Sequence, residues 1–176
     1  AQGQIYIGGV ALSQQGSNND LADWLLRQSH TVIRDALIVW VDEKRDVPPL
    51  VLRQVNLHID SLLSHHRFAL RALPPDDIAT PMDVRGDFHG ASFDDLSNWH
   101  GQIFTQLYFT DVGAWRHWLN LPEELGRGRG AVRSWLSVET GRVSGIIADL
   151  ALYNVGAKLA GDAPEMLLPS LRCRVT

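Results

Sequence analysis

The chain has a single cysteine, Cys173, among its 176 residues. One cysteine cannot form an internal disulfide, and no second thiol is present to make a metal-binding pair. No stretch approaches 18 consecutive apolar residues, so we predict no membrane-spanning helix. No charged segment followed by an apolar stretch opens the chain, so we also predict no signal peptide. The first residue is Ala1 rather than Met, and we expect the chain to be an internal piece of a longer protein.

Positive charge is also scarce. Lysine and arginine number 16 against 20 aspartates and glutamates, which gives a formal net charge of −4. Proteins that bind nucleic acids usually carry a basic excess, because neutralising phosphates supplies much of their affinity. The charge balance therefore predicts no nucleic-acid partner. Lys44 and Lys158 are the only lysines, which we interpret as a compositional bias.

What the sequence has in abundance is alternation of apolar and polar residues. This pattern predicts antiparallel strands with one apolar and one solvated side. The segment Leu50–Asp60 places Val51, Val55, Leu57 and Ile59 on its apolar side and Gln54, Asn56, His58 and Asp60 on its polar side. The segment His65–Gly90 predicts two strands separated by a proline turn at Pro74–Pro75. The other predicted strands are Gln4–Leu12, Thr31–Asp42 with a break at Asp35–Ala36, Gln102–Thr110, Ala131–Glu139, Val143–Tyr153 and Met166–Arg174.

Helical spacing occurs only briefly. Two short helices are predicted over Asp20–Gln28 and Asp111–Leu119. Asn19 or Asp20 is suited to cap the first, and Asp111 the second. We expect Leu121–Gly130 to form a loop and Glu139–Arg142 a hairpin turn. No strand–helix–strand rhythm appears, which argues against a parallel doubly wound sheet. The fold class is therefore mainly β: a single domain over residues 1–176, with roughly eight or nine long antiparallel strands in a curved, groove-like or sandwich-like sheet.

We find no pattern that predicts a metal site or a cofactor. The chain has seven histidines, but His65 and His66 are adjacent and so face opposite sides of a strand. The remaining histidines are scattered along the sequence, without the spacing of helical zinc ligands. We therefore predict surface histidines.

No catalytic residues are predicted either. The segment Gly126–Gly130, "GRGRG", lacks the lysine and hydroxyl residue of a phosphate-binding loop. The acidic pairs Asp76–Asp77 and Asp94–Asp95 are adjacent in turns, whereas acid–base catalysis needs carboxylates opposed across a pocket. Cys173 has no nucleophile signature around it. We interpret the six tryptophans as packing residues, with Trp24, Trp115 and Trp118 joining the two helices to the sheet.

Four segments, in order along the chain, resemble one family. They are "LADWLLRQSHTVIRDALIVWVDE", "HRFALRALPPDDIATPMDVRGDFHG", "NWHGQIFTQLYFTDVGAWRHWLNLP" and "GRGRGAVRSWLSVETGRV". The most distinctive motifs are the "HRFALRALPP" run and the Trp-x-Gly before a strand. The chain resembles the YhdP-type branch of the AsmA-like proteins of Gram-negative envelopes.

This resemblance implies a segment of a long periplasmic β-structure in a protein anchored to the inner membrane. Such proteins look like curved sheets with an apolar groove and are implicated in phospholipid movement between the inner and outer membranes. The family brings no catalytic residues, so none is carried over. The expected ligand is the acyl chains of phospholipids, without a cofactor.

Alternation alone leaves two uses of the apolar side open: packing against a second sheet, or lining a groove for acyl chains. If a groove exists, its candidate lining residues are Phe68, Leu70, Met82, Val84, Phe88, Ile103, Leu107 and Phe109. A fragment cut from a long sheet also leaves unpaired edges, so we expect the first or last strand to be exposed or to pair with another copy. The alternative functions are an envelope scaffold that binds proteins through its edge strands and an unrecognised hydrolase.

Overall fold

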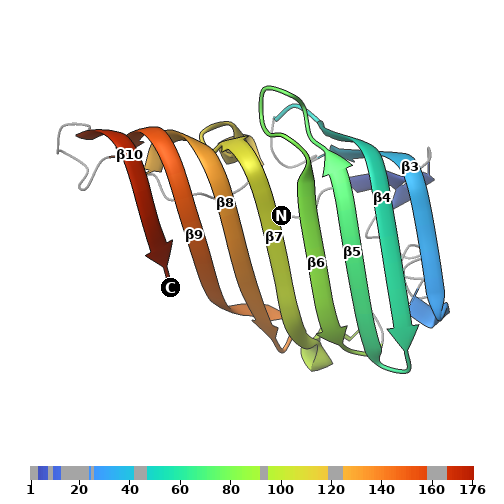
Figure 1. The fold of residues 1–176 in the computed structure, drawn as a ribbon. Helices are drawn as coiled ribbons and strands as arrows, with labels where there is room; N and C mark the ends of the chain where they lie inside the picture. Colours follow the sequence, from blue (N-terminus) through green and yellow to red (C-terminus); the bar gives the residue numbers. More distant parts are fainter. Residues whose placement is uncertain are drawn as a thin grey trace.

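The computed structural model describes residues 4–7, 10–12, 24, 26–41, 47–91, 95–118, 125–157 and 166–176. Ten strands form one antiparallel sheet in the order β10-β9-β8-β7-β6-β5-β4-β3-β1-β2 (Figure 1). From β3 to β10 each strand lies beside its successor in the sequence, so this part is a meander. The strands are β1 (Gln4–Ile7), β2 (Val10–Leu12), β3 (His30–Val41), β4 (Leu50–Leu62), β5 (His65–Leu73), β6 (Met82–His89), β7 (His100–Asp111), β8 (Leu125–Glu139), β9 (Arg142–Ala157) and β10 (Met166–Val175).

The prediction of a mainly β fold with long antiparallel strands is confirmed, but the prediction of two short helices is corrected. The named helical elements are two 3-10 turns, η1 (Leu96–Asn98) and η2 (Ala114–His117), and Trp24, Leu26 and Arg27 are also helical. The predicted helix Asp111–Leu119 is shortened because Asp111 still belongs to β7. The predicted helix Asp20–Gln28 falls largely outside the described residues.

Glycines explain why the predicted hairpin turn at Glu139–Arg142 is confirmed and why the predicted loop Leu121–Gly130 is partly wrong. Thr140 and Gly141 join β8 to β9 and both have positive φ, as a two-residue hairpin turn requires. The predicted loop Leu121–Gly130 is wrong for its second half, because β8 already begins at Leu125. Gly130 lies so close to the carbonyl of Ala151 in β9 that a Cβ would clash. Glycine here permits close strand pairing rather than a loop.

Several β-bulges lie toward one end of the sheet. The predicted break in β3 is confirmed, since the register shifts there and Asp35 has φ 52°. Gln54 in β4 and Asn154 in β9 also have positive φ and lie at register shifts. A further shift occurs in β7 between Leu107 and Thr110. Bulges bend strands and increase twist, and the sheet curls over at this end in Figure 1.

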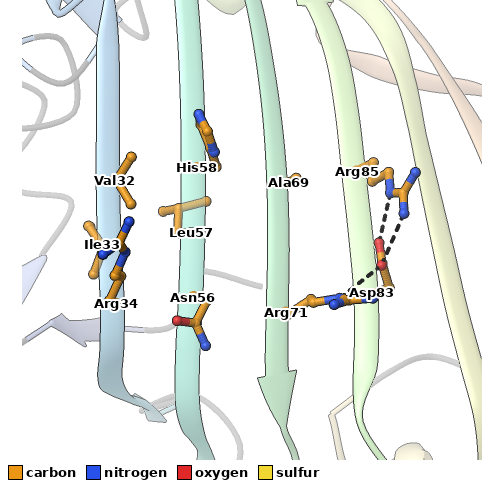
Figure 2. A pocket seen from close by; sticks show the side chains of 10 residues that line it. All are labelled: Val32, Ile33, Arg34, Asn56, Leu57, His58, Ala69, Arg71, Asp83 and Arg85. Atoms are coloured by element: carbon orange, nitrogen blue, oxygen red, sulfur yellow. Dashed lines mark hydrogen bonds and ion pairs between the residues drawn. The ribbon is translucent and has the colours of Figure 1, made fainter.

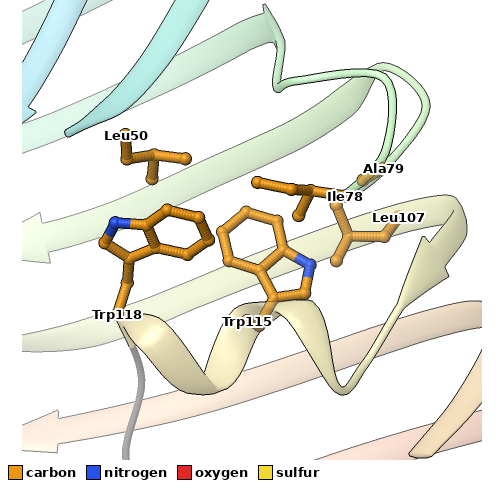
Figure 3. Close-up of a cluster of buried hydrophobic side chains, with 6 residues drawn as sticks. All are labelled: Leu50, Ile78, Ala79, Leu107, Trp115 and Trp118. Carbon is orange, nitrogen blue, oxygen red and sulfur yellow. The ribbon is translucent and has the colours of Figure 1, made fainter. Parts of the chain in front are cut away.

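A cluster of buried side chains covers the same end of the sheet. We call it the tryptophan cluster; it consists of Leu50, Ile78, Ala79, Leu107, Trp115 and Trp118 (Figure 3). The Nε1 of Trp115 donates a hydrogen bond to the Oγ1 of Thr110 at 2.6 Å, and the Nε1 of Trp118 donates to the carbonyl of Pro48 at 2.9 Å. Because both indole donors are satisfied, these large rings can be buried at little polar cost.

A second aromatic cluster lies at the opposite ends of β5, β6 and β7. The buried ring of Trp99 occupies the space that a Cβ on Gly90 would need. It stacks on His66 with ring centroids 5.7 Å apart and also contacts Phe88. The ring of Phe68 similarly fills the space above Gly86. At this end of the sheet, aromatic rings therefore pack directly over the backbone of the two glycines.

Candidate functional site

The apolar sides of the strands join into one continuous face. The pairing registers place every second residue of neighbouring strands in rows that run across the strands. One such row lies between the two aromatic clusters, and we call it the open middle. Its residues are Ile33, Leu57, Leu70, Val84, Thr105, Ser134 and Ala148.

The open middle is only half-buried, unlike the tryptophan cluster beside it. Leu70 and Val84 have intermediate exposure, whereas Leu50 and Leu107 retain 5% and 8% of their accessible surface. The described residues contain one sheet and no second sheet that could close a sandwich over this row. In the described part of the chain, the apolar face is therefore an uncovered surface bounded by two covered ends.

The eight predicted lining residues differ in which face of the sheet they occupy and in how exposed they are. Seven of them belong to the apolar face: Phe68, Leu70, Met82, Val84, Phe88, Ile103 and Leu107. Leu107 is buried within the tryptophan cluster, so it is not free to contact a ligand. Phe109 does not follow the alternation, because the register shifts between Leu107 and Thr110, and its side chain is 49% exposed. Whether any of these residues contacts lipid stays a prediction.

Sequence reasoning left out other members of this face. Leu57 and Ile59 lie directly opposite Leu70 and Phe68, and Leu136 lies opposite Ile103. The alternation in β4 had already placed Leu57 and Ile59 on an apolar side, so that signal was present. Thr105 and Ser134 give no such signal, because small hydroxyl residues in a strand are as common on a polar face.

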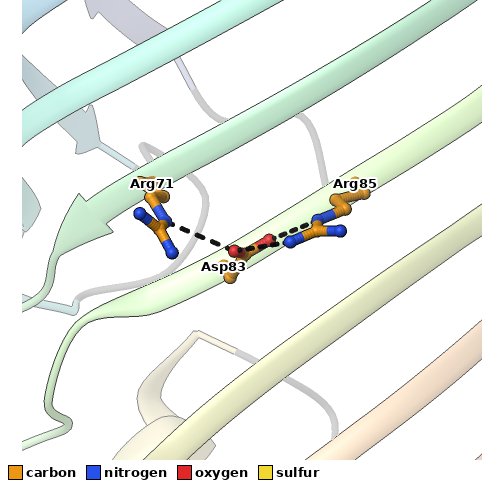
Figure 4. Close-up of polar contacts among 3 residues, drawn as sticks. All are labelled: Arg71, Asp83 and Arg85. Carbon is orange, nitrogen blue, oxygen red and sulfur yellow. Dashed lines mark hydrogen bonds and ion pairs between the residues drawn. The ribbon is translucent and has the colours of Figure 1, made fainter.

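The opposite face carries charges, and its most buried ionised group among the described residues is Asp83 in β6. Arg71 lies directly across from it in β5, and Arg85 lies two residues further along β6 on the same side (Figure 4). Arg85 donates from Nε and Nη2 at 2.9 and 3.2 Å, and the Nε of Arg71 lies 3.4 Å away. Hydrogen bonding from Arg85 is the largest cause that holds the pKa of Asp83 below its ordinary value.

A shallow depression of about 440 Å³ lies beside this ion pair (Figure 2). It spans β3 to β6, and Arg34, Asn56 and His58 contribute polar atoms to it. The carboxylate of Asp83 already receives the hydrogen bonds of Arg71 and Arg85. Among the described residues that line the depression, none is a serine, threonine or cysteine nucleophile.

The histidines are less scattered than the sequence suggested. His30, His58 and Asp60 bring their side-chain nitrogen and oxygen atoms within 4.8 Å of one another, and so do His65, Asp87 and His89. The prediction of surface histidines is confirmed for His30, His58 and His89, which are exposed. It is wrong for His66, which retains 5% of its accessible surface. The hydrogen bond from His30 is the largest cause that lowers the pKa of Asp60, so its carboxylate is ionised at neutral pH.

The fold and the apolar face together define a class of protein: a single curved antiparallel sheet that exposes a continuous apolar strip between covered ends. The sequence model of the YhdP protein family matches residues 2–176. The chain therefore belongs to the YhdP family, in agreement with the resemblance drawn from its sequence. No curated protein and no solved structure matches it significantly. Among the described residues, no helix has the length and apolar character needed to cross a bilayer.

Proposed function

We propose that this chain is a non-enzymatic, periplasmic segment of an AsmA-like envelope protein, and that its apolar face holds phospholipid acyl chains in transit between the inner and outer membranes. The observation that carries the proposal is the open middle, a row of mainly apolar, half-buried side chains on a sheet with no second layer among the described residues. A contiguous exposed apolar strip usually marks a binding surface.

The direction of the strip suits transport. The open middle runs across the strands, from β3 to the edge strand β10, where Val175 lies opposite Ala148. Eight strands at a spacing of ~4.8 Å extend such a strip over roughly 35 Å. The two aromatic clusters lie at the sides of the strip, so acyl chains could move along it without passing them.

The composition of the strip suits hydrocarbon better than a polar ligand. From β3 to β6 the open middle consists of Ile33, Leu57, Leu70 and Val84. Burying these side chains against acyl chains would yield about 25 cal/mol for each Å² removed from water. Thr105 and Ser134 are less favourable, and their hydroxyls can bond within their own strands. We place the tightest contacts over β4, β5 and β6.

The experiment uses a photoreactive phenylalanine analogue at single positions. Leu70 faces the strip, and its neighbour Ala69 in β5 faces the opposite side, so the two positions form a matched pair. Val84 and Arg85 form a second pair in β6. We expect phospholipid adducts at Leu70 and Val84 and none at Ala69 and Arg85, read by mass spectrometry of the protein purified from cell envelopes. Equal labelling of both faces, or labelling of neither, would contradict the proposal.

A second candidate is a scaffold that binds other proteins along its sheet edge. In the described residues β10 pairs only with β9, so its outer backbone groups are open to pairing, and Leu167 beside them is 63% exposed. Pro169 interrupts this edge, because proline has no N–H to donate. Protein adducts at Leu167 without lipid adducts at Leu70 would favour the scaffold.

A further inference from the structure

We propose that His30, His58 and Asp60 form a binding site for one divalent transition-metal ion on the polar face of the sheet. The site does not depend on the proposed lipid function, since it lies on the opposite face. His30 begins β3 and pairs directly with Asp60 in β4. His58 lies two residues before Asp60, so both point to the same side of the strand. The strand register alone brings the three side chains together.

The distances between the three atoms suit a metal ion. The Nδ1 of His30 lies 2.8 Å from the Oδ1 of Asp60 and 3.3 Å from the Nε2 of His58, and the third side of this triangle is 3.7 Å. Two tetrahedral ligands bound at 2.0–2.1 Å are separated by about 3.3 Å. The observed triangle is centred on that value, so an ion could bind with only small movements of the side chains.

One hydrogen bond cannot join all three of these side-chain atoms. The N–H of His30 can point at Asp60 or at His58, but not at both with good geometry. An ion at the centre would accept a lone pair from all three atoms. The two imidazole rings are also nearly perpendicular, at 80° with centroids 4.6 Å apart. Because an imidazole lone pair lies in the plane of its ring, crossed rings can direct both lone pairs to one point.

The second histidine group has less suitable geometry. The rings of His65 and His89 are stacked at 7° with centroids 4.3 Å apart. Lone pairs in parallel rings run side by side and do not converge on one ion. His89 also stacks on His100 at 5°. We therefore assign the metal to the first group, and the second serves as a comparison.

The ligand set selects the kind of metal. Two imidazoles and one carboxylate suit zinc and the neighbouring transition metals, whereas calcium and magnesium prefer oxygen ligands. The side chains of His30, Asp60 and His58 are 55%, 54% and 49% exposed. A water molecule can therefore complete the coordination of the ion. Such a metal would tie the first residue of β3 to β4.

The test is titration of the chain, prepared without a histidine tag, with Zn²⁺ in isothermal calorimetry. We expect one ion per chain. His58→Asn and Asp60→Asn should each weaken binding by at least about tenfold, since each removes a direct ligand. The control variants His117→Asn and His89→Asn should bind as the unchanged chain does. Circular dichroism with a chelator present should show that all four variants are folded, because the altered side chains are exposed or half-exposed.

A second readout uses Co²⁺ in place of Zn²⁺. Bound Co²⁺ should give visible absorption bands of a four-coordinate site, and these should disappear in His58→Asn but persist in His117→Asn. Absence of binding by the unchanged chain would overturn the proposal. Binding that is unaffected by both His58→Asn and Asp60→Asn, or that is lost in His89→Asn, would overturn it as well.

Discussion

Two regions of the same apolar face differ in what covers them. At one end the tryptophan cluster closes over the strands. The connection between β5 and β6 supplies Ile78, and the turn η2 and its C-cap supply Trp115 and Trp118. A few residues further along the same strands, the open middle has similar side chains but stays half-exposed. The comparison separates two roles of apolar residues in one sheet: the first region stabilises the fold, and the second leaves a surface for a ligand.

The largest expected effect comes from making one substitution in both regions. Leu107→Ala removes a side chain that is 8% exposed within the tryptophan cluster, and we expect it to lower the free energy of unfolding by about 2–4 kcal/mol. Leu70→Ala, in the open middle, removes a half-exposed side chain and should cost about 1–2 kcal/mol. Urea unfolding of both variants gives the two values. Equal losses would mean that Leu70 is as well packed as Leu107, and the comparison would fail.

The same comparison shows what the sequence could predict. Alternation placed Phe68, Leu70 and Val84 on one face, because a period of two holds wherever a strand is regular. It failed at Phe109, which lies in the register shift of β7. It failed in the same way at Val51, which pairs with Val39 beyond the bulge at Gln54 and so changes sides. A single extra residue reverses the faces, and alternation carries no sign of it.

Contacts between segments that are distant in the sequence were the second feature that the sequence could not predict. His30 and Asp60 are 30 residues apart, and only the pairing of β3 with β4 brings them together. Trp115 and Trp118 were expected to pack on the sheet, and both are buried. The expectation for Trp24 was wrong, since its side chain is 55% exposed. The burial of a tryptophan depends on which strands lie beneath it, and local spacing does not record this.

A smaller effect, on the polar face behind the open middle, depends on pH. We expect Asp83→Asn to lower the free energy of unfolding at pH 7 by about 1 kcal/mol, because the buried carboxylate loses charged hydrogen bonds while both arginines still reach water. The folded-state pKa of Asp83 is lowered, so its ion pair stabilises fully above the unfolded pKa of about 4 and less as the pH falls below it. The difference between the unchanged chain and Asp83→Asn should therefore shrink below pH 4.

Asp149→Asn is the matched control for this pH dependence. Asp149 also accepts two hydrogen bonds from an arginine, Arg174, but its side chain is 33% exposed, whereas that of Asp83 is 10% exposed. Exposed ion pairs contribute little to stability. We expect no measurable change at pH 7 for Asp149→Asn. If both variants lose the same stability, burial of Asp83 is not the cause of its effect.

A further expected effect, smaller for Asp35→Gly than for Asp83→Asn, concerns the bend between the two regions. Asp35 occupies the bulge of β3 with φ 52°, a left-handed conformation that costs a residue with a Cβ more than it costs glycine. Asp35→Gly relieves this cost but adds freedom to the unfolded chain, which offsets part of the gain. We expect a net stabilisation of roughly 0.5 kcal/mol. Ala36→Gly, one residue further and outside the left-handed region, should instead destabilise by about 1 kcal/mol. Opposite signs at these adjacent positions would show that the bulge in β3 forms as described, and a loss of stability in both variants would place the bend elsewhere.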